Sequence, residues 1–257
     1  MNATQSMTAA RANLNTVFGR QAYLKQDVAI KEERLPFTVR LVQNESDLAK
    51  AVKIRHAAYA RHVPDFAETL RLPEAADYAS DAVVLLAESR LDGSPLGTCR
   101  IHTNANRPLS LEQSVQLPAW LQGRRLSEVT RLGIREGAIG RVVKAALMKA
   151  SFQFWEQNGI EWVVVAGREP IDRHYEQLLF QDVFPGLGYI PMAHAGNIPH
   201  RVMAFEMETA YARWSAANHP LLNFVCHTNH ADIDITARPE MPMMPVQSSQ
   251  LTHELLM

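Results

Sequence analysis

The feature that most constrains the fold is a block in the middle of the chain. There a strand pattern, a glycine loop and a helix pattern follow one another. Residues 126–134 (LSEVTRLGI) are typical of a strand, 135–140 (REGAIG) of a loop, and 141–158 of a helix that Gly159 ends. Residues 162–166 (WVVVA) then form an unbroken apolar run, which is typical of a strand buried on both faces. We expect the two strands to run parallel, with the helix as their crossover.

This block predicts a phosphate-binding site. The N–H groups at the start of a helix and the positive end of its dipole both face an anion placed at the loop. A doubly wound dinucleotide domain would carry its glycine loop after the first strand of an all-parallel sheet. Here the loop comes in the middle of the chain, after strands expected to be antiparallel, and this order disfavours a dinucleotide site.

The surrounding segments predict a mixed α/β domain. The Asp92-Gly93 turn between two apolar runs indicates a hairpin, and in the crossover helix Val143, Leu147, Ala150 and Phe154 share one face. The other elements are expected as a strand at 37–43, a helix over 47–62 capped by Ser46 and stopped by Pro64, hairpin strands at 81–88 and 96–102, a loop-rich stretch over 103–123, a helix over 170–180, a strand at 202–208 and a helix over 210–225 interrupted at Pro220.

Composition sets the outer limits of the interpretation. Lys and Arg number 26 against 27 Asp and Glu, a balance that argues against bulk binding to nucleic acid. Cys99 and Cys226 provide neither a disulfide framework nor a paired zinc motif, so we expect no metal. The N-terminal residues lack the apolar core of a signal peptide and no run reaches the length of a transmembrane segment, which predicts a cytoplasmic protein. We expect an N-terminal arm or helix at 1–35, one domain at 36–235 and a flexible tail at 236–257.

The order of elements, with the loop sequence REGAIGR at 135–141, resembles the GNAT N-acyltransferase fold, a central mixed sheet flanked by helices. Four motifs in chain order make the resemblance more specific. They are IRHAAY (54–59), the acidic pair Asp77 and Asp81, GTCRI (97–101) and SEVTRL (127–132). They are similar to motifs of LuxI-type acyl-homoserine-lactone synthases and of the related FeeM-type N-acyl amino acid synthases. The chain, over about residues 36–210, looks closer to the latter.

The resemblance implies an N-acyltransferase that moves a long-chain acyl group from a thioester to the α-amine of an amino acid. It implies no permanently bound cofactor, and an acyl-phosphopantetheine thioester as co-substrate. Gly137 and Gly140 are the only glycines of the loop and Glu136 would repel a dense anion, so acyl carrier protein is favoured while coenzyme A stays open. Basic residues near the loop could dock an acidic carrier or simply be solvated. They are Arg124, Arg125, Arg135, Arg141, Lys144 and Lys149.

Glu128 is the candidate base, acting directly or through a water, with a pKa raised by burial. The alternative is a structural ion pair with Arg131, for which a positioning role is equally open. Residues three apart point to opposite faces of a regular strand, so such a pair needs a bulge. The resemblance implies this irregularity, which would free N–H groups at 132–134 as an oxyanion hole. Tyr175 is the candidate acid for the leaving thiolate, or else a core-edge aromatic.

For substrate binding, the resemblance implies that Tyr59 lies at the acceptor, with Arg55 and Arg100 able to bind its carboxylate. Asp77 and Asp81 would bind its ammonium group. As alternatives, the arginines are surface charges and the aspartates lie in a solvated loop. The donor site is expected at Leu132, Ile134, Gly137, Ala138, Gly140 and Arg141, with the loop 103–123 and its Trp120 lining an acyl tunnel. Two other functions stay open: an acyl-homoserine-lactone synthase and a non-catalytic module that binds an acyl carrier.

Overall fold

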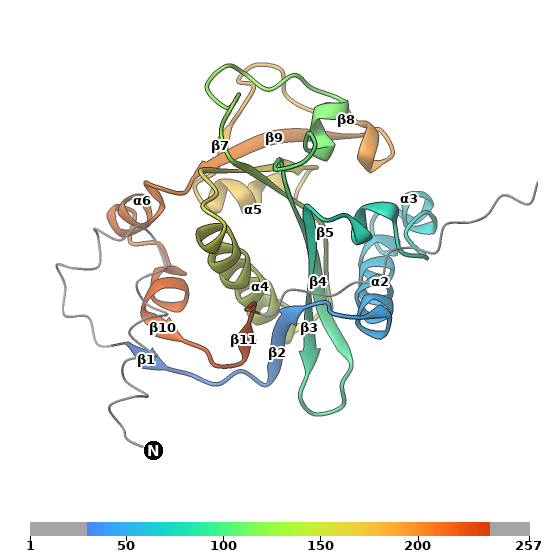
Figure 1. Ribbon diagram of the computed structural model, residues 1–257, viewed down its shortest axis with the longest axis vertical. Coiled ribbons are helices and arrows are strands. Elements are labelled where there is room, and N and C mark those ends of the chain that lie inside the picture. Colours follow the sequence, from blue (N-terminus) through green and yellow to red (C-terminus); the bar gives the residue numbers. More distant parts are fainter. Residues whose placement is uncertain (1–29, 237–257) are drawn as a thin grey trace, which may run out of the picture.

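The computed structural model, which describes residues 30–236, is built around one mixed sheet of nine strands (Figure 1). Its order is β11-β2-β3-β4-β5-β6-β9-β7, and β8 pairs with β9. The strands are β2 (Phe37–Leu41), β3 (Ala82–Ser89), β4 (Pro95–Thr103), β5 (Leu126–Ile134), β6 (Trp162–Gly167), β7 (Gln181–Asp182), β8 (Ile190–Met192), β9 (Ile198–Glu206) and β11 (Ile233–Asp234). A separate pair joins β1 (Lys31–Glu32) to β10 (Thr228–Asn229).

Helices cover both faces of this sheet. In Figure 1, α2 and α3 lie on one side of it and α4 and α6 on the other. The helices are α2 (Glu45–Ala60), α3 (Pro64–Glu68), α4 (Ala138–Gln157), α5 (Asp172–Gln177) and α6 (Ala210–Ala216). Short turns are η2 (Ala75–Tyr78), η3 (Ser110–Gln113), η4 (Ala193–Ala195) and the π-helical η5 (Asn223–His227). None of the helices within residues 30–236 combines the length and apolarity needed to traverse a bilayer.

The predicted order of strand, glycine loop, crossover helix and strand is confirmed, although α4 begins at Ala138, three residues earlier than predicted. Strand β5 has the predicted bounds and pairs with β6 in parallel, whereas β2 to β5 pair antiparallel in sequence. The sheet is therefore mixed, with the glycine loop and α4 as the crossover between its two central parallel strands. Residues 1–29 of the arm predicted at 1–35 lie outside the described residues. The same holds for residues 237–257 of the tail predicted at 236–257.

Several predicted helix boundaries were wrong. Helix α2 begins two residues early, because the N–H of Asp47 donates to the side chain of Asn44, which takes the capping role expected of Ser46. Pro64 begins α3 rather than only ending α2. The helices expected to run to 180 and 225 end at 177 and 216. In each case a residue with a left-handed backbone follows the helix, Leu179 (φ 68°) and Asn218 (φ 47°).

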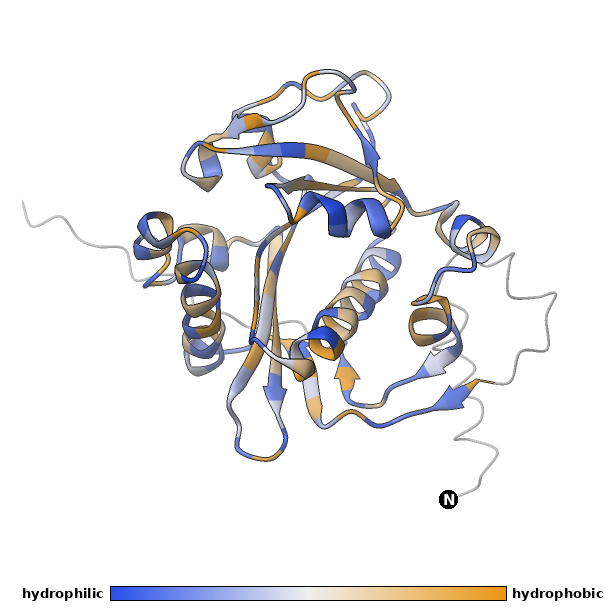
Figure 2. Ribbon diagram, turned by 180° about the vertical axis from the view of Figure 1, so that it is seen from behind, coloured by the Kyte–Doolittle hydropathy of each residue, from blue (hydrophilic) through white to orange (hydrophobic). Residues whose placement is uncertain are grey.

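The face of α4 packs into the main hydrophobic core. Val143, Leu147 and Ala150 are buried as predicted, but Phe152 and Trp155 are the buried aromatic residues, and Phe154 is only partly buried. Figure 2 shows apolar colours along most of α4, while the short α5 is largely hydrophilic. The crossover helix is thus held firmly against the sheet, and its N-terminus is fixed in place.

The loop-rich stretch 103–123 closes the opposite face of the sheet. Leu109, Leu111 and Leu121 are buried in a second cluster with Val164 of β6 and Met192 of β8. They pack with one another and line neither of the two cavities described below. The two cavities described below therefore give no support to the prediction that this loop lines an acyl tunnel.

Candidate active site

The two central parallel strands diverge halfway along their length. The β5–β6 ladder runs from the pair Leu126/Trp162 to the pair Val129/Val165 and ends there, while β6 continues on β9 and β5 on β4. Beyond Val129, the backbone groups of β5 that face β6 have no ladder partner on that strand. A wedge-shaped opening results in the middle of the sheet.

A β-bulge in β5 accompanies this opening. The β4–β5 register passes from Arg100/Thr130 to Thr98/Gly133, so two residues of β5 oppose Cys99 alone. Arg131 has a φ of 56° at this point. Thr130 and Arg131 consequently point to the same face, where Thr130 contacts His102 at 3.2 Å and Arg131 binds Glu74. The irregularity expected in this strand is present, and it places Glu128 and Arg131 on one face without pairing them with each other.

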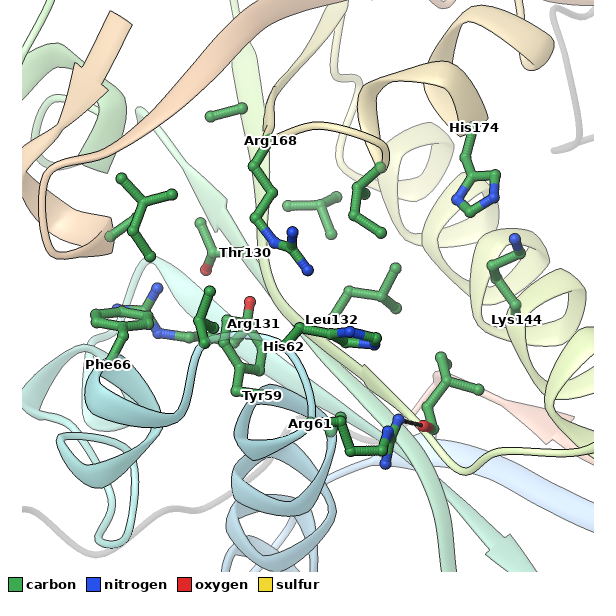
Figure 3. A pocket seen from close by; sticks show the side chains of 18 of the residues that line it. Tyr59, Arg61, His62, Phe66, Thr130, Arg131, Leu132, Lys144, Arg168 and His174 are labelled. Atoms are coloured by element: carbon green, nitrogen blue, oxygen red, sulfur yellow. Dashed lines mark hydrogen bonds between the residues drawn. The ribbon is translucent and has the colours of Figure 1, made fainter. Parts of the chain in front are cut away.

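A cavity of about 380 Å³ occupies the opening (Figure 3). Both faces of the sheet contribute to its lining. Thr130, Ala166 and His194 belong to the face that carries η3 and η4, whereas Leu132, Lys144 and Tyr175 belong to the face that carries α4 and α5. The cavity therefore spans the sheet.

The cavity brings together eight of the predicted site residues. These are Tyr59, Arg131, Leu132, Ile134, Gly137, Gly140, Arg141 and Tyr175. Six others do not line it, namely Arg55, Asp77, Asp81, Arg100, Glu128 and Ala138.

A second cavity, of about 460 Å³, adjoins the first on the α4 face. Leu147, Met148, Trp155, Leu178 and Phe180 are among its walls, and its surface is mainly apolar. The residues shared by both cavities include Val129, Leu132, Ile171, His174 and Tyr175, and also Arg141 and Lys144.

The glycine loop forms one end of the first cavity. Gly137 precedes α4 with a φ of 94°, and a side chain on Gly140 would collide with the carbonyl oxygen of Arg135. Glu136 was expected to repel an anion at the loop, but its carboxylate forms an ion pair with Arg61 at 3.1 Å. Arg61 also donates to the carbonyl oxygen of Ile134 at 2.7 Å. The N-terminus of α4 is thus open to an anion.

Only three of the six basic residues expected around the loop lie near the cavity, and these are Arg135, Arg141 and Lys144. Arg124 and Arg125 form ion pairs with Glu161 before β6, at the far end of β5. Lys149 is buried and donates to the carbonyl oxygens of Phe224 and Thr228. Both alternatives left open for Lys149, docking of a carrier and a solvated helix face, were therefore wrong.

Tyr175 lies where the two cavities join. Burial raises the pKa of its phenol above the usual value, so the side chain stays protonated at all moderate pH values. Its ring packs against Phe180 with centroids 5.5 Å apart. Tyr175 is therefore a core-edge aromatic that also lines both cavities, and its role as the acid stays a prediction.

A buried charge network supports the wall of the cavity. Arg55 binds Asp77 through two hydrogen bonds of 2.9 and 2.7 Å, and Arg131 binds Glu74 through two of 2.7 Å. Arg100 contacts both carboxylates at 3.0 Å. Burial alone would raise the pKa of Asp77, but the hydrogen bonds and charge of Arg55, with the charge of Arg100, lower it to about 2. Three arginines thus share two carboxylates.

This network occupies the side chains that were expected to hold the acceptor. Arg55, Asp77 and Arg100 bind one another instead of facing the cavity, and Asp81 pairs with Arg107 at 2.9 Å. Glu74, which the sequence interpretation missed, joins the three arginines. Its position three residues before Asp77, in a capping box, is the signal that could have identified it.

Glu128 reaches the cavity only through His194. The carboxyl group is fully buried, its Oε2 accepts from the N–H of Ser110 at 2.7 Å, and its Oε1 lies 3.6 Å from His194 Nε2. Burial raises the pKa of Glu128 to about 7. His194 lines the cavity, and burial together with the charge of Arg131 lowers its pKa to about 4. Its Nδ1 is buried without a hydrogen-bond partner among the described residues.

Comparison with known proteins identifies the fold. No family model and no curated protein matches the sequence. Among solved structures, it is similar to FeeM, an N-acyl amino acid synthase from uncultured soil microbes. The TM-score is 0.55 at 18% identity, over 73% of this chain and 96% of that one. The chain has the GNAT fold, as its motif order predicted.

Two further structures are similar at lower scores. BjaI, a CoA-dependent acyl-homoserine lactone synthase, matches with a TM-score of 0.47 at 16% identity, over 76% of this chain and 93% of that one. An N-acetyltransferase from Lactobacillus plantarum, whose activity is inferred, matches with a TM-score of 0.46 at 13% identity, over 67% and 99% of the two chains.

Proposed function

We propose that this protein is an N-acyltransferase that moves a long-chain acyl group from a phosphopantetheine thioester to the α-amine of an amino acid. The observation that carries the proposal is the divergence of β5 and β6. It opens a cavity across the sheet between the glycine loop and a neutral buried histidine. The similarity in fold to an N-acyl amino acid synthase supports it.

The donor enters on the α4 face. Its phosphate binds at the N-terminus of α4, beside Gly137 and Arg141. The pantetheine arm lies along β5 beyond Val129, where the backbone amide groups that face β6 form no hydrogen bonds with that strand. The acyl chain fills the apolar cavity of about 460 Å³, which lies within the usual range for small-molecule sites.

The reaction follows from the groups at the junction of the two cavities. The amine nitrogen attacks the thioester carbonyl carbon, and N–H groups of the bulge in β5 stabilise the oxyanion. The C–S bond breaks as the amide forms. The proton lost by the amine passes to His194, and the thiolate takes a proton from Tyr175. A proton then returns through solvent from His194 to the Tyr175 phenolate, which restores both groups. The products are an N-acyl amino acid and a free thiol.

Acyl carrier protein is the donor that the loop favours. The donor end of the cavity carries Arg135, Arg141 and Lys144, which suits one phosphodiester and the acidic surface of a carrier. We therefore infer that the carrier docks over the glycine loop. Coenzyme A, with its additional phosphates, is the second donor to test.

The purified full chain tests this function directly. It is incubated with palmitoyl-acyl carrier protein or palmitoyl-CoA and a mixture of the common amino acids, and products are identified by mass spectrometry. We expect an N-palmitoyl amino acid and one free thiol per product, faster with the carrier protein. Carrier binding without product would instead identify a non-catalytic binding module. Transfer confined to an added homoserine-lactone precursor would identify a lactone synthase.

A further inference from the structure

Arg168 is one of four cationic side chains of the cavity that form no ion pair with a described carboxylate; the other three are Arg135, Arg141 and Lys144, at the glycine loop and on α4. It follows β6 directly, and Figure 3 shows it extending into the middle of the cavity. Its Nη1 donates a hydrogen bond of 2.9 Å to the carbonyl oxygen of Glu169. Within residues 30–236, no carboxylate lies at ion-pair distance from it.

Two other arginines around the opening are paired with carboxylates. Arg131 is bound by Glu74, and Arg61 by Glu136. Glu136 is also the only acidic residue among the described residues that line this cavity. Because Arg135, Arg141 and Lys144 belong to the glycine loop and α4, an anionic ligand group placed in the half of the cavity away from them would meet Arg168.

The position of Arg168 separates it from the donor phosphate. Along β6, Val163 and Val165 pack in the core on the α4 face, whereas Val164 and Ala166 pack with the cluster on the opposite face. Arg168 continues this second series by strand alternation. Gly167 pairs with Arg201 of β9, which places Arg168 beside His200. The glycine loop that leads into α4 lies on the other face.

We propose that Arg168 binds the carboxylate of the acceptor, so that the protein selects amines that carry an α-carboxylate. This inference rests on the proposed function and specifies its acceptor site. A guanidinium group binds a carboxylate through two parallel hydrogen bonds. The amine, one carbon away, is thereby held in the half of the cavity that contains His194. Tyr59, Phe66 and Ile198 supply an apolar wall for the acceptor side chain.

The test compares two acceptors that differ only in the carboxylate, L-phenylalanine and phenethylamine. Arg168→Gln should lower kcat/KM for phenylalanine by about 10- to 100-fold, the usual value of a charged hydrogen-bonded contact, mainly through KM. The rate with phenethylamine and the KM for the donor should stay within about 3-fold of the wild-type values on the same reasoning. Arg168→Lys should recover part of the loss, because it keeps the charge without the planar fork.

Arg173→Gln is the matched control, since Arg173 lies on α5, is exposed and is absent from both cavities. An equal loss with both acceptors, or a rise in the donor KM, would overturn the inference, and the latter would assign Arg168 to the donor phosphate. Thermal melting checks that each variant is folded.

Binding of L-phenylalanine without donor, measured by saturation-transfer NMR, separates this inference from the proposed function. If the wild type binds and Arg168→Gln does not, the carboxylate site stands even where no acyl transfer is seen. If both bind equally, or neither binds, the inference is overturned whatever the enzyme activity.

Discussion

At the scale of single residues, the properties that the proposed base needs are divided between Glu128 and His194. His194 is neutral and lines the cavity, whereas Glu128 is buried behind it and can become negative near neutral pH. An ionised Glu128 favours the protonated form of the imidazole and so strengthens it as a base. In the proposed reaction, Glu128 is therefore a positioning residue whose protonation controls His194.

Replacing Glu128 with Gln should change the pH profile of the reaction. In the wild type, kcat/KM should rise as pH passes through about 7, because the carboxylate forms there. In Glu128→Gln this rise should disappear, with a loss of about 100-fold at pH 8, at the low end of what acid–base groups contribute. Any rise from titration of the amine itself remains in both proteins. An unchanged inflection near pH 7 would exclude Glu128 from this role.

The same variant should be more stable than the wild type at alkaline pH. The folded protein holds the pKa of Glu128 at about 7 against an ordinary value of 4.5. The wild type therefore loses stability as pH rises between these values, by up to about 3 kcal/mol. Urea unfolding measures the free energy of unfolding of both proteins at pH 4.5 and pH 8. Between these two pH values, the stability of Glu128→Gln relative to the wild type should increase by about 3 kcal/mol.

Glu74 tests the charge network. Glu74→Gln leaves three buried arginines with one carboxylate, so we expect a loss of about 3 kcal/mol in the free energy of unfolding. This lies near the low end for a buried pair, because 24% of the Glu74 side chain is exposed. Glu68→Gln, which breaks an exposed pair with Arg71, should have little effect in the same urea titration. Equal effects would show that the network adds no stability.

What the sequence revealed about single residues depended on motifs. Tyr59, Tyr175 and Arg141 could be placed at the cavity because each lies in a recognisable helix or loop. His194 lies in an irregular turn and Arg168 after a strand end, so no periodicity marks either. The partners of Arg55 and Arg100 depend on tertiary packing, which residue spacing alone does not specify.

At the scale of elements, the strand, loop and crossover helix could be predicted because glycine and apolar periodicity mark them directly. Their parallel pairing followed from the buried apolar run of β6. The ends of α5 and α6 could not be predicted, since Leu179 and Asn218 adopt left-handed backbones that leucine in particular seldom takes. The bulge was expected from the resemblance alone.

Gly140→Ala tests the loop as a donor site. The added methyl group would collide with the carbonyl oxygen of Arg135 and open the turn before α4. We expect the donor KM to rise about 10-fold or more, as for the loss of a charged hydrogen-bonded contact, while amino acid binding is unchanged. Gly123→Ala, at a site with no atom near the added methyl group, is the control for backbone strain. A normal donor KM in Gly140→Ala would contradict the assignment.

At the scale of the whole molecule, the two ends of the described chain lie together. Strand β1 pairs with β10, and β11 pairs in parallel with β2. Lys149 of α4 donates from inside the core to the turn that leads into β10. Sequence patterns predicted the order of the central elements but not this closure. It depends on Lys149, for which the sequence left open carrier docking or a solvated face and did not indicate burial.

Lys149→Met should therefore loosen the C-terminal segment. It leaves the carbonyl oxygens of Phe224 and Thr228 without their donor, and each buried unsatisfied group costs about 1–3 kcal/mol. We expect a total loss of about 2–4 kcal/mol and faster amide exchange in residues 223–230. Lys53→Met, on the exposed side of α2, is the control. Exchange rates matching the wild type would show that other contacts hold this segment.

Because residues from both faces of the sheet line the cavity, the proposed reaction lets donor and acceptor approach from opposite faces. Neither has to leave before the other arrives, so both orders of arrival lead to the same ternary complex. Initial-rate plots at several fixed concentrations of the second reactant should then intersect rather than run parallel. A covalent acyl-protein has no part in such a scheme, and Cys99, buried with the pKa of its thiol raised to about 12, is unsuited to form one.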